Sequence, residues 1–125
     1  MPTEARQTAE RRGRWAEALC RLHLRLTGWS VIGQRHRQAR GTGAGEIDII
    51  ARRGHVLAFI EVKARETGDA ALEAVSTSQQ ERISRGAAAF LAAHPQHADC
   101  TMRFDVMAVR PWRWPLHVKG AWRIN

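Results

Sequence analysis

The sequence predicts an α/β fold, with one domain in which a small mixed sheet is flanked by helices. Two stretches have helical periodicity, and four other runs have the alternation or β-branched content of strands. Their order is helix, three strands, helix, strand, which is typical of a sheet with helices packed against it. The 125 residues are about one domain in length. No repeat, linker or low-complexity tract divides residues 1–125.

The first predicted helix covers about residues 8–27, and residues 1–7 ahead of it are expected to fray. Its larger apolar residues fall in one narrow stripe at helical spacing, formed by Trp15, Leu19, Leu22 and Leu26. We expect this stripe to pack against the sheet and Gly28 to end the helix.

The second predicted helix follows the segment ETGDAALEAV. Ser78 and Glu81 have the spacing of a capping box, which predicts that Ser78 is the N-cap. Pro95 is expected to end the helix. Its apolar stripe comprises Ile83, Ala87, Phe90 and Leu91.

Four strands are predicted, at about residues 29–37, 46–53, 56–64 and 101–109. A glycine-rich loop at residues 40–45 separates the first strand from the second. The second and third strands are close enough in sequence to form a hairpin. The tail carries three tryptophans and two prolines, so its pattern predicts no element.

Asp48, Glu61 and Lys63 share one face of this hairpin if the numbers of opposed residues add to an odd total, because side chains alternate along each strand. A two-residue turn that begins at Gly54 meets this condition and places Asp48 opposite Glu61. Glycine at that position suits a type II′ turn. A turn that begins one residue earlier also meets it and places Asp48 opposite Phe59. Both registers predict the shared face.

Composition predicts a cytoplasmic protein without a membrane partner. No apolar run is long enough to span a bilayer, and the first residues have no signal-peptide pattern. Cys20 and Cys100 lie in apolar surroundings without metal-binding spacing. They are therefore predicted to be buried free thiols in a reducing compartment.

The net charge of +8 is unevenly distributed. Bases outnumber acids by nine to three in residues 1–45 and by five to one in residues 101–125, whereas acids outnumber bases by eight to six in residues 46–100. Basic flanks attract polyanions such as nucleic acid, and an acidic centre repels phosphate unless a cation intervenes. This distribution indicates a metal site close to a polyanion, with an arginine-rich, highly soluble protein as the plain alternative.

The acidic centre contains Asp48, Glu61 and Lys63 within an otherwise apolar strand pair. Two carboxylates that converge across a hairpin are suited to bind Mg²⁺ or Mn²⁺. A lysine beside them can orient an attacking water or stabilise an anionic transition state. Only Lys63 and Lys119 among the twenty basic residues are lysine, which makes Lys63 a specific choice. An exposed charged face on an ordinary hairpin is the alternative interpretation.

Two stretches, GEID at residues 45–48 and FIEVKAR at residues 59–65, resemble the signature of the YraN-like proteins. This bacterial family is grouped with the PD-(D/E)XK nuclease superfamily and is similar to archaeal Holliday-junction resolvases. The resemblance extends over about residues 13–109. Two positions depart from the family pattern, with Gln79 where lysine is usual and His36 where asparagine is usual. Further matching positions are Glu17, Ala18, Arg35, Arg37, Val75, Ser76, Gln80, Arg82, Ile83, Arg103, Phe104, Asp105 and Val106.

The resemblance implies a restriction-endonuclease-like core and a Mg²⁺- or Mn²⁺-dependent endonuclease that hydrolyses DNA. Asp48 and Glu61 would bind the metal, Glu17 would add a third acid, and Lys63 would assist the attacking water. Glu17 alternatively pairs with an arginine of its own helix. The implied substrate is DNA that is branched or has single-stranded regions, cut by a homodimer. The expected nucleic-acid contacts are Arg35, Arg37, Arg40, Arg65, Gln80 and Arg82.

A function without catalysis is also compatible with the sequence. A non-catalytic nucleic-acid-binding or adaptor module could retain the same fold and residues. The tryptophans of the tail are interleaved with basic residues and suit stacking on unpaired bases, but tryptophans also close a core or a dimer interface. Asp105 lies two residues from Arg103 in a predicted strand, which predicts a structural ion pair.

Overall fold

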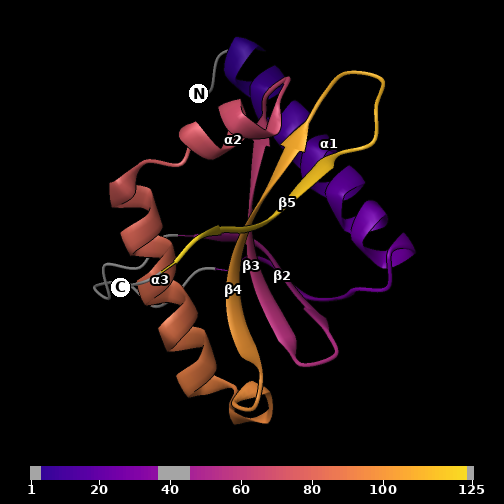
Figure 1. Cartoon of the computed structure of the whole chain (residues 1–125). Helices are drawn as coiled ribbons and strands as arrows, with labels where there is room; N and C mark the ends of the chain where they lie inside the picture. Colours follow the sequence, from indigo (N-terminus) through magenta and orange to yellow (C-terminus); the bar gives the residue numbers. More distant parts are fainter. Residues whose placement is uncertain (1–3, 37–45, 124–125) are drawn as a thin grey trace.

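The computed structural model describes the backbone of residues 4–36 and 46–123, with side chains from Gly13 onward. The predicted order of helix, three strands, helix and strand is confirmed, and α2, η1 and β5 are additional. The predicted loop at residues 40–45 lies outside the described residues, as do Arg37 and Arg40. The elements in chain order are α1 (Glu4–Leu26), β1 (Ser30–His36), β2 (Ile47–Arg53), β3 (Val56–Ala64), α2 (Gly68–Glu73), α3 (Thr77–Ala93), the 3-10 helix η1 (Pro95–His97), β4 (Thr101–Val109) and β5 (Leu116–Trp122) (Figure 1).

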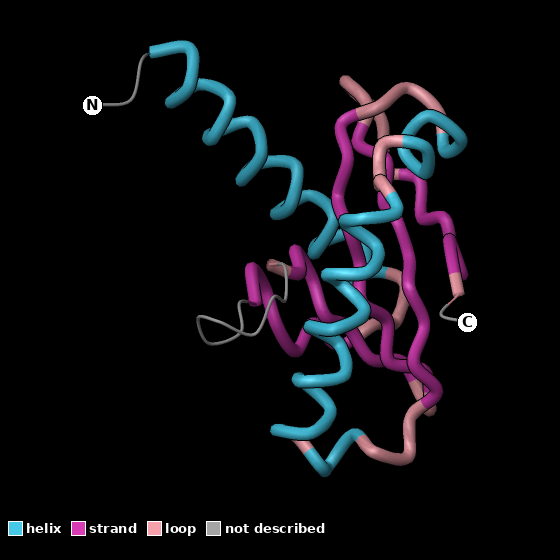
Figure 2. The backbone as a smooth tube through the Cα atoms, turned by 90° about the vertical axis from the view of Figure 1, so that its left-hand side faces the viewer, coloured by secondary structure: helices cyan, strands magenta, loops and turns pink. Residues whose placement is uncertain are grey.

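The five strands form one mixed sheet in the order β1-β2-β3-β4-β5. Neighbouring strands are antiparallel except β3 and β4, which are parallel. A parallel pair requires a crossover connection, and α2 and α3 supply it. α1 packs on one face of the sheet, and α2 and α3 pack on the other (Figure 1, Figure 2). The prediction of a single mixed α/β domain is confirmed.

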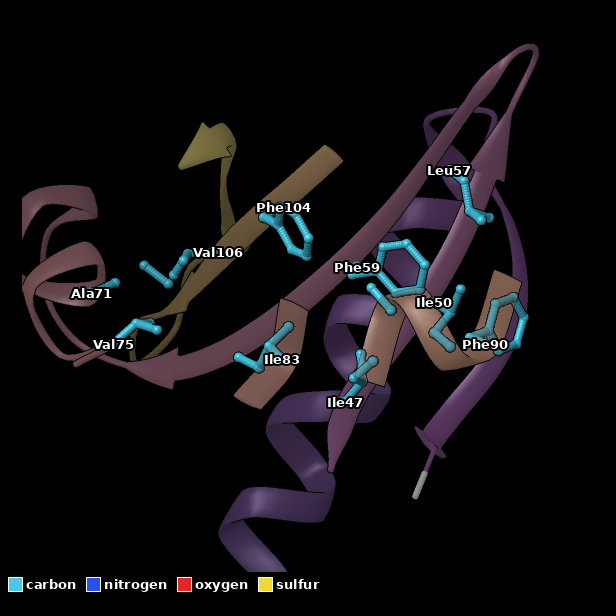
Figure 3. Packing of buried hydrophobic residues seen from close by; sticks show 12 residues of the cluster. Ile47, Ile50, Leu57, Phe59, Ala71, Val75, Ile83, Phe90, Phe104 and Val106 are labelled. Atoms are coloured by element: carbon cyan, nitrogen blue, oxygen red, sulfur yellow. The ribbon is translucent and has the colours of Figure 1, made fainter. Parts of the chain in front are cut away.

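Side-chain alternation along the strands divides the core into two clusters, one on each face of the sheet. Because β2 and β3 contribute to both, a charged residue in the middle of these strands, such as Glu61, is buried. The cluster beneath α1 comprises Cys20, Leu24, Trp29, Ile49, Ala51, Ala58, Ile60 and Met107. The cluster beneath α2 and α3 includes Ile47, Ile50, Leu57, Phe59, Ala71, Val75, Ile83, Phe90, Phe104 and Val106 (Figure 3).

The hairpin of β2 and β3 has the first of the two predicted registers. Its pairs run from Ile49 with Ile60 to the turn at Gly54 and His55. Gly54 has a φ of 59°, and a type II′ turn requires a positive φ at its first position. The turn and the register predicted from parity are both confirmed.

The predicted buried face of α1 is wrong. Trp15 is 71% exposed and Leu26 is 67% exposed, whereas Ala16, Cys20 and Leu24 on another face are buried. The small side chains of Ala16 and Cys20 let the helix approach the sheet closely, so that face makes the contact. Helical periodicity identifies residues that share a face, but it does not show which face fits the sheet.

The helix α1 ends at the predicted glycine. Gly28 has a φ of 92°, a conformation that glycine adopts readily. The Trp29 amide donates to the Leu24 carbonyl at 2.9 Å, and the Gly28 amide donates to the Arg25 carbonyl at 3.3 Å. These are the two hydrogen bonds of a Schellman motif, and they lead Trp29 into the core.

The helix α3 begins two residues earlier than its capping-box spacing predicts. Ser76, rather than Ser78, is the N-cap, and its hydroxyl accepts a hydrogen bond from the Gln79 amide at 3.1 Å. Ser78 is already helical, so it does not cap the first turn. Three hydroxyl residues stand in succession here, and only the backbone conformation shows which of them is the cap.

The tryptophan-rich tail, for which the sequence predicted no element, forms β5 against β4. Both tail prolines lie outside the strand, where they remove no ladder hydrogen bond. Buried Asp105 joins the two strands. It accepts hydrogen bonds from Arg103 at 2.8 and 2.9 Å and from the Gly120 amide at 3.0 Å, and His117 Nε2 lies 2.7 Å from it. The predicted ion pair of Arg103 and Asp105 is confirmed.

Two expectations from composition can be compared with the described part of the chain. No helix in it combines the length and the apolar character needed to cross a membrane. Cys20 and Cys100 are free thiols, as predicted. Cys20 is buried, whereas Cys100 is only half-buried because it precedes β4 near the protein surface, so the predicted burial is wrong for Cys100.

Candidate active site

The hairpin places the carboxylates of Asp48 and Glu61 together, on the side of the sheet that α3 covers. The β2–β3 ladder ends at the pair of Ile49 and Ile60. Beyond this pair, the Val62 amide donates to Asp48 Oδ2 at 2.9 Å. The Asp48 side chain therefore takes the place of a backbone partner for β3, which holds its carboxylate beside Glu61.

Glu61 is a buried carboxyl group with an unusual electrostatic environment. It is only 6% exposed, so the alternative of an exposed charged face is wrong for this residue. Burial, a hydrogen bond with Asp48 and the negative charge of Asp48 raise the pKa of Glu61 to about 9. Without a cation, Glu61 therefore keeps its proton at neutral pH and shares it with Asp48.

Lys63 follows Glu61 by two positions on β3 and faces the same side of the sheet. Its side chain is half-buried, and its positive charge partly offsets the effects that raise the Glu61 pKa. An ammonium group beside two carboxylates is suited to position a water molecule or to stabilise an anion.

A cavity of about 280 Å³ opens beside the carboxylate pair and is bounded on one side by α3. Arg82, expected from the sequence to contact nucleic acid, lines this cavity, and so does Gln79. Gln80, another expected contact, instead donates its side-chain amide to the Val75 carbonyl at 3.2 Å. Glu46 also lines the cavity and was not predicted from the sequence. Its position two residues before Asp48 predicts that the two side chains share a face of the strand, and this was the signal available in the sequence.

Glu17 approaches from α1 and pairs with Arg35 of β1 at 2.7 Å. Its charge contributes to the raised pKa of Glu61, so Glu17 lies near the pair. The hydrogen bond with Glu17 raises the pKa of Arg35, and the charges of Glu17, Glu46 and Asp48 add to it. The guanidinium thus provides positive charge at the edge of an acidic cluster. Arg35 has a φ of 48°, which is rare outside glycine.

Arg65, a further expected nucleic-acid contact, lies just beyond the end of β3. It is exposed and donates to the Ala64 carbonyl at 2.8 Å. Of the four expected nucleic-acid contacts that the structure describes, only Arg82 lines the cavity, and Arg35 lies at the edge of the acidic cluster.

The carboxylate pair offers oxygen ligands for a metal ion. In residues 13–36 and 46–123, no three His, Cys, Asp or Glu side chains converge as a metal site. Glu61 Oε2 is buried and has no hydrogen-bond partner among the described groups, so it can still accept a ligand. Two carboxylates fit Mg²⁺ or Mn²⁺, since such ions use one or two carboxylates and retain several waters.

Cys20 lies one turn after Glu17 on the buried face of α1. Burial, followed by the charges of Asp48 and Glu17, raises the pKa of its thiol to about 12. Since only a thiolate is a good nucleophile or metal ligand, Cys20 serves the core rather than the chemistry of the site.

Fold and site together define a single-domain mixed α/β protein with a carboxylate pair, of which Glu61 is buried, and an adjacent lysine on a central hairpin. Its residues 16–109 match the model of Uncharacterised protein family UPF0102, and the chain belongs to this family. It is 50% identical to a UPF0102 protein of Paramagnetospirillum magneticum, over 99% of this chain and 96% of that protein. A relative in Parvibaculum lavamentivorans is also 50% identical, over 92% of this chain and 84% of its own length. A UPF0102 protein of Mesorhizobium japonicum is 43% identical, over 96% and 93% of the two chains.

Proposed function

We propose that this protein is a metal-dependent endonuclease that hydrolyses DNA phosphodiester bonds. The observation that carries the proposal is the pairing of buried Glu61 with half-buried Asp48, with a Glu61 oxygen that has no partner among the described groups and Lys63 on the same face. Burying two carboxylates side by side is costly unless a cation offsets their charge. Perturbed acids beside a cavity are candidates for catalysis for this reason.

We further infer that α1, the sheet from β1 to β4 and α3 form a restriction-endonuclease-like core of the PD-(D/E)XK superfamily. The inference rests on the resemblance of the GEID and FIEVKAR stretches. The confirmed hairpin register supports it, because it places Asp48 of the first stretch on the same face as Glu61 and Lys63 of the second. In this interpretation Asp48, Glu61 and Lys63 are the signature residues.

Each residue of the site has a separate task in the proposed reaction. Asp48 and Glu61 would hold Mg²⁺ or Mn²⁺, and Glu61 would release its proton to solvent to do so. Such a cation would supply charge neutralisation at the scissile phosphate and a more acidic water. Lys63 orients the attacking water or stabilises the charge that develops on the phosphate. Arg82 of α3 lines the same cavity and would contact a neighbouring phosphate.

Glu17 has a conditional role in this proposal. Its Oε2 is held by Arg35 Nε at 2.7 Å, so this oxygen becomes a further ligand only if that ion pair opens. A DNA phosphate that competes for the exposed Arg35 guanidinium would release Glu17 toward the acidic cluster. Arg35 would then serve as the nucleic-acid contact expected from the sequence. A homodimer would bring two such sites to the two strands of a branched DNA.

Cleavage assays on plasmid, single-stranded, flapped and four-way-junction DNA with Mn²⁺ test the proposal. We expect Asp48→Ala, Glu61→Ala and Lys63→Ala each to lower cleavage by roughly 100-fold or more. Lys119→Ala and Asp99→Ala are matched controls, because both residues are exposed and lie outside the cavity lining. Cleavage that survives all three site substitutions would refute the assignment.

A non-catalytic nucleic-acid-binding or adaptor module is the second candidate. The observation that favours it is the lack of three converging ligands within the described ranges. Such a module binds DNA in a salt-dependent way without hydrolysing any substrate. Titration calorimetry with Mn²⁺, with and without duplex DNA, separates the two functions. The nuclease must bind Mn²⁺, whereas the adaptor module need not.

A further inference from the structure

A second pocket lies between α1 and the β4–β5 loop, on the opposite side of the sheet from the carboxylate pair. Figure 1 shows this loop passing beside α1. The pocket has a volume of about 620 Å³, and its walls include Trp15, Leu19, Arg110, Trp112, Arg113 and Trp114. Ligand pockets commonly have volumes of about 300–1,000 Å³. None of these residues takes part in the proposed reaction.

The tryptophans of the chain fall into two groups. Trp122 packs on Phe104, with the ring centroids 5.3 Å apart and nearly parallel, and Trp29 is buried under α1. By contrast, Trp112 is fully exposed (102%), Trp15 is 71% exposed and Trp114 is 52% exposed. The core therefore accounts for the first group only. Three exposed tryptophans in a single pocket indicate a surface that binds a partner.

Trp112 is held in an unfavourable backbone conformation. Its φ is 60°, in the left-handed region that bulky residues rarely adopt. Arg110 Nη2 donates to the Trp114 carbonyl at 3.1 Å, which closes the loop around it. Strained residues are often found where they serve a ligand, and the Trp112 ring is fully exposed among the described residues.

The charge of the pocket distinguishes between possible occupants. Arg110 and Arg113 stand among the tryptophans, and none of the described residues that line the pocket is acidic. A symmetric contact with a second copy would bring four guanidinium groups together without a carboxylate. A polyanion that carries aromatic rings matches both the arginines and the tryptophans.

We propose that this pocket binds the unpaired bases of single-stranded DNA. A base stacks on Trp112 beside Trp114 and Trp15, while Arg110 and Arg113 hold the adjoining phosphates. The proposal rests on the proposed nuclease function and specifies its substrate as DNA with an unpaired segment. The pocket and the active site lie on opposite sides of the sheet near the same end of β3, where Ala64 lines the pocket and its neighbour Lys63 points to the side of the carboxylates. A DNA strand that passes around this end of the sheet would reach both.

Binding of a labelled oligothymidylate, measured by fluorescence anisotropy in EDTA at fixed salt, tests the proposal. We expect Trp112→Leu to weaken binding by roughly 5- to 100-fold, as loss of base stacking does. Trp112→Phe should retain most of the affinity, since it keeps an aromatic face. A blunt duplex of the same length should bind Trp112→Leu and wild type equally. Leu26→Ala is the control, being an exposed apolar residue outside the pocket lining.

Two results would overturn the proposal. One is wild-type affinity of Trp112→Leu for the oligothymidylate. The other is a dimer, seen by sedimentation velocity, that Trp112→Leu dissociates while single-strand binding persists. Failure of this proposal can be distinguished from failure of the nuclease function. EDTA prevents metal-dependent cleavage, so the anisotropy assay measures DNA binding alone. In a separate assay with Mn²⁺, Lys63→Ala should abolish cleavage, so the nuclease function is tested apart from oligothymidylate binding.

Discussion

Replacement of Glu61 by glutamine should stabilise the metal-free protein at neutral pH. Glutamine has the shape of a protonated glutamic acid, and its amide can donate to Asp48 as the shared proton does. Glutamine carries no charge, so folding at neutral pH no longer requires the uptake of a proton at this position. The same substitution should remove the stabilisation that Mn²⁺ confers on the wild type, because a ligand of the proposed metal site is lost.

The size of the effect follows from the raised pKa. The Glu61 pKa is about 9 in the folded protein, against 4.5 for an ordinary glutamate. Its contribution to stability is therefore fully present below pH 4.5 and is lost progressively as the pH rises toward 9. The loss is about 1.4 kcal/mol per pH unit, which amounts to about 3 kcal/mol at pH 7. Glu61→Gln should recover this amount at pH 7 and almost nothing near pH 4.5.

Urea unfolding of wild type and Glu61→Gln in EDTA, at several pH values across this range, measures the difference directly. Glu66→Gln is the matched control, since Glu66 is exposed and lies just beyond the same strand. A stability difference that is the same at every pH would show that Glu61 has the same pKa in the folded and the unfolded state. The description of a shared proton between Asp48 and Glu61 would then be refuted.

Two further predictions concern the scaffold, and both are measured by urea unfolding. Burial opposes ionisation of Asp105, but hydrogen bonds from its histidine, arginine and backbone partners outweigh it and lower the Asp105 pKa. Asp105→Asn should therefore cost roughly 3–5 kcal/mol at pH 7, with the difference shrinking as acid protonates the wild-type carboxyl, and exposed Asp99→Asn should cost little. Ser76→Ala should cost about 1 kcal/mol through loss of the α3 cap, and Ser78→Ala should cost less. Equal costs at the two serines would contradict the revised helix start.

The hairpin and the end of α1 were predictable because their signals are local. A glycine at the first turn position selects the turn, and strict alternation then decides which residues share a face. The burial of Glu61 also follows from the apolar residues on either side of it. The start of α3 was not predictable to the residue, because Ser76, Thr77 and Ser78 are all acceptable caps.

Several features depend on contacts between distant segments. The pairing of Glu17 with Arg35 requires α1 to lie against β1, and no spacing within α1 indicates this. The Trp112 pocket joins residues that are far apart in the sequence. The tail pairs with β4 as β5, where His117 and Gly120 supply partners to the buried Asp105.

The sequence by itself determined the α/β class, the order of most elements and the common face of Asp48, Glu61 and Lys63. These features follow from periodicity and turn chemistry, which act over a few residues. Only the tertiary structure decided which face of α1 is buried, which carboxyl group keeps a proton, and which tryptophans remain exposed. Burial, desolvation and charge coupling depend on distances between segments, and those distances are set only when the sheet and helices pack together.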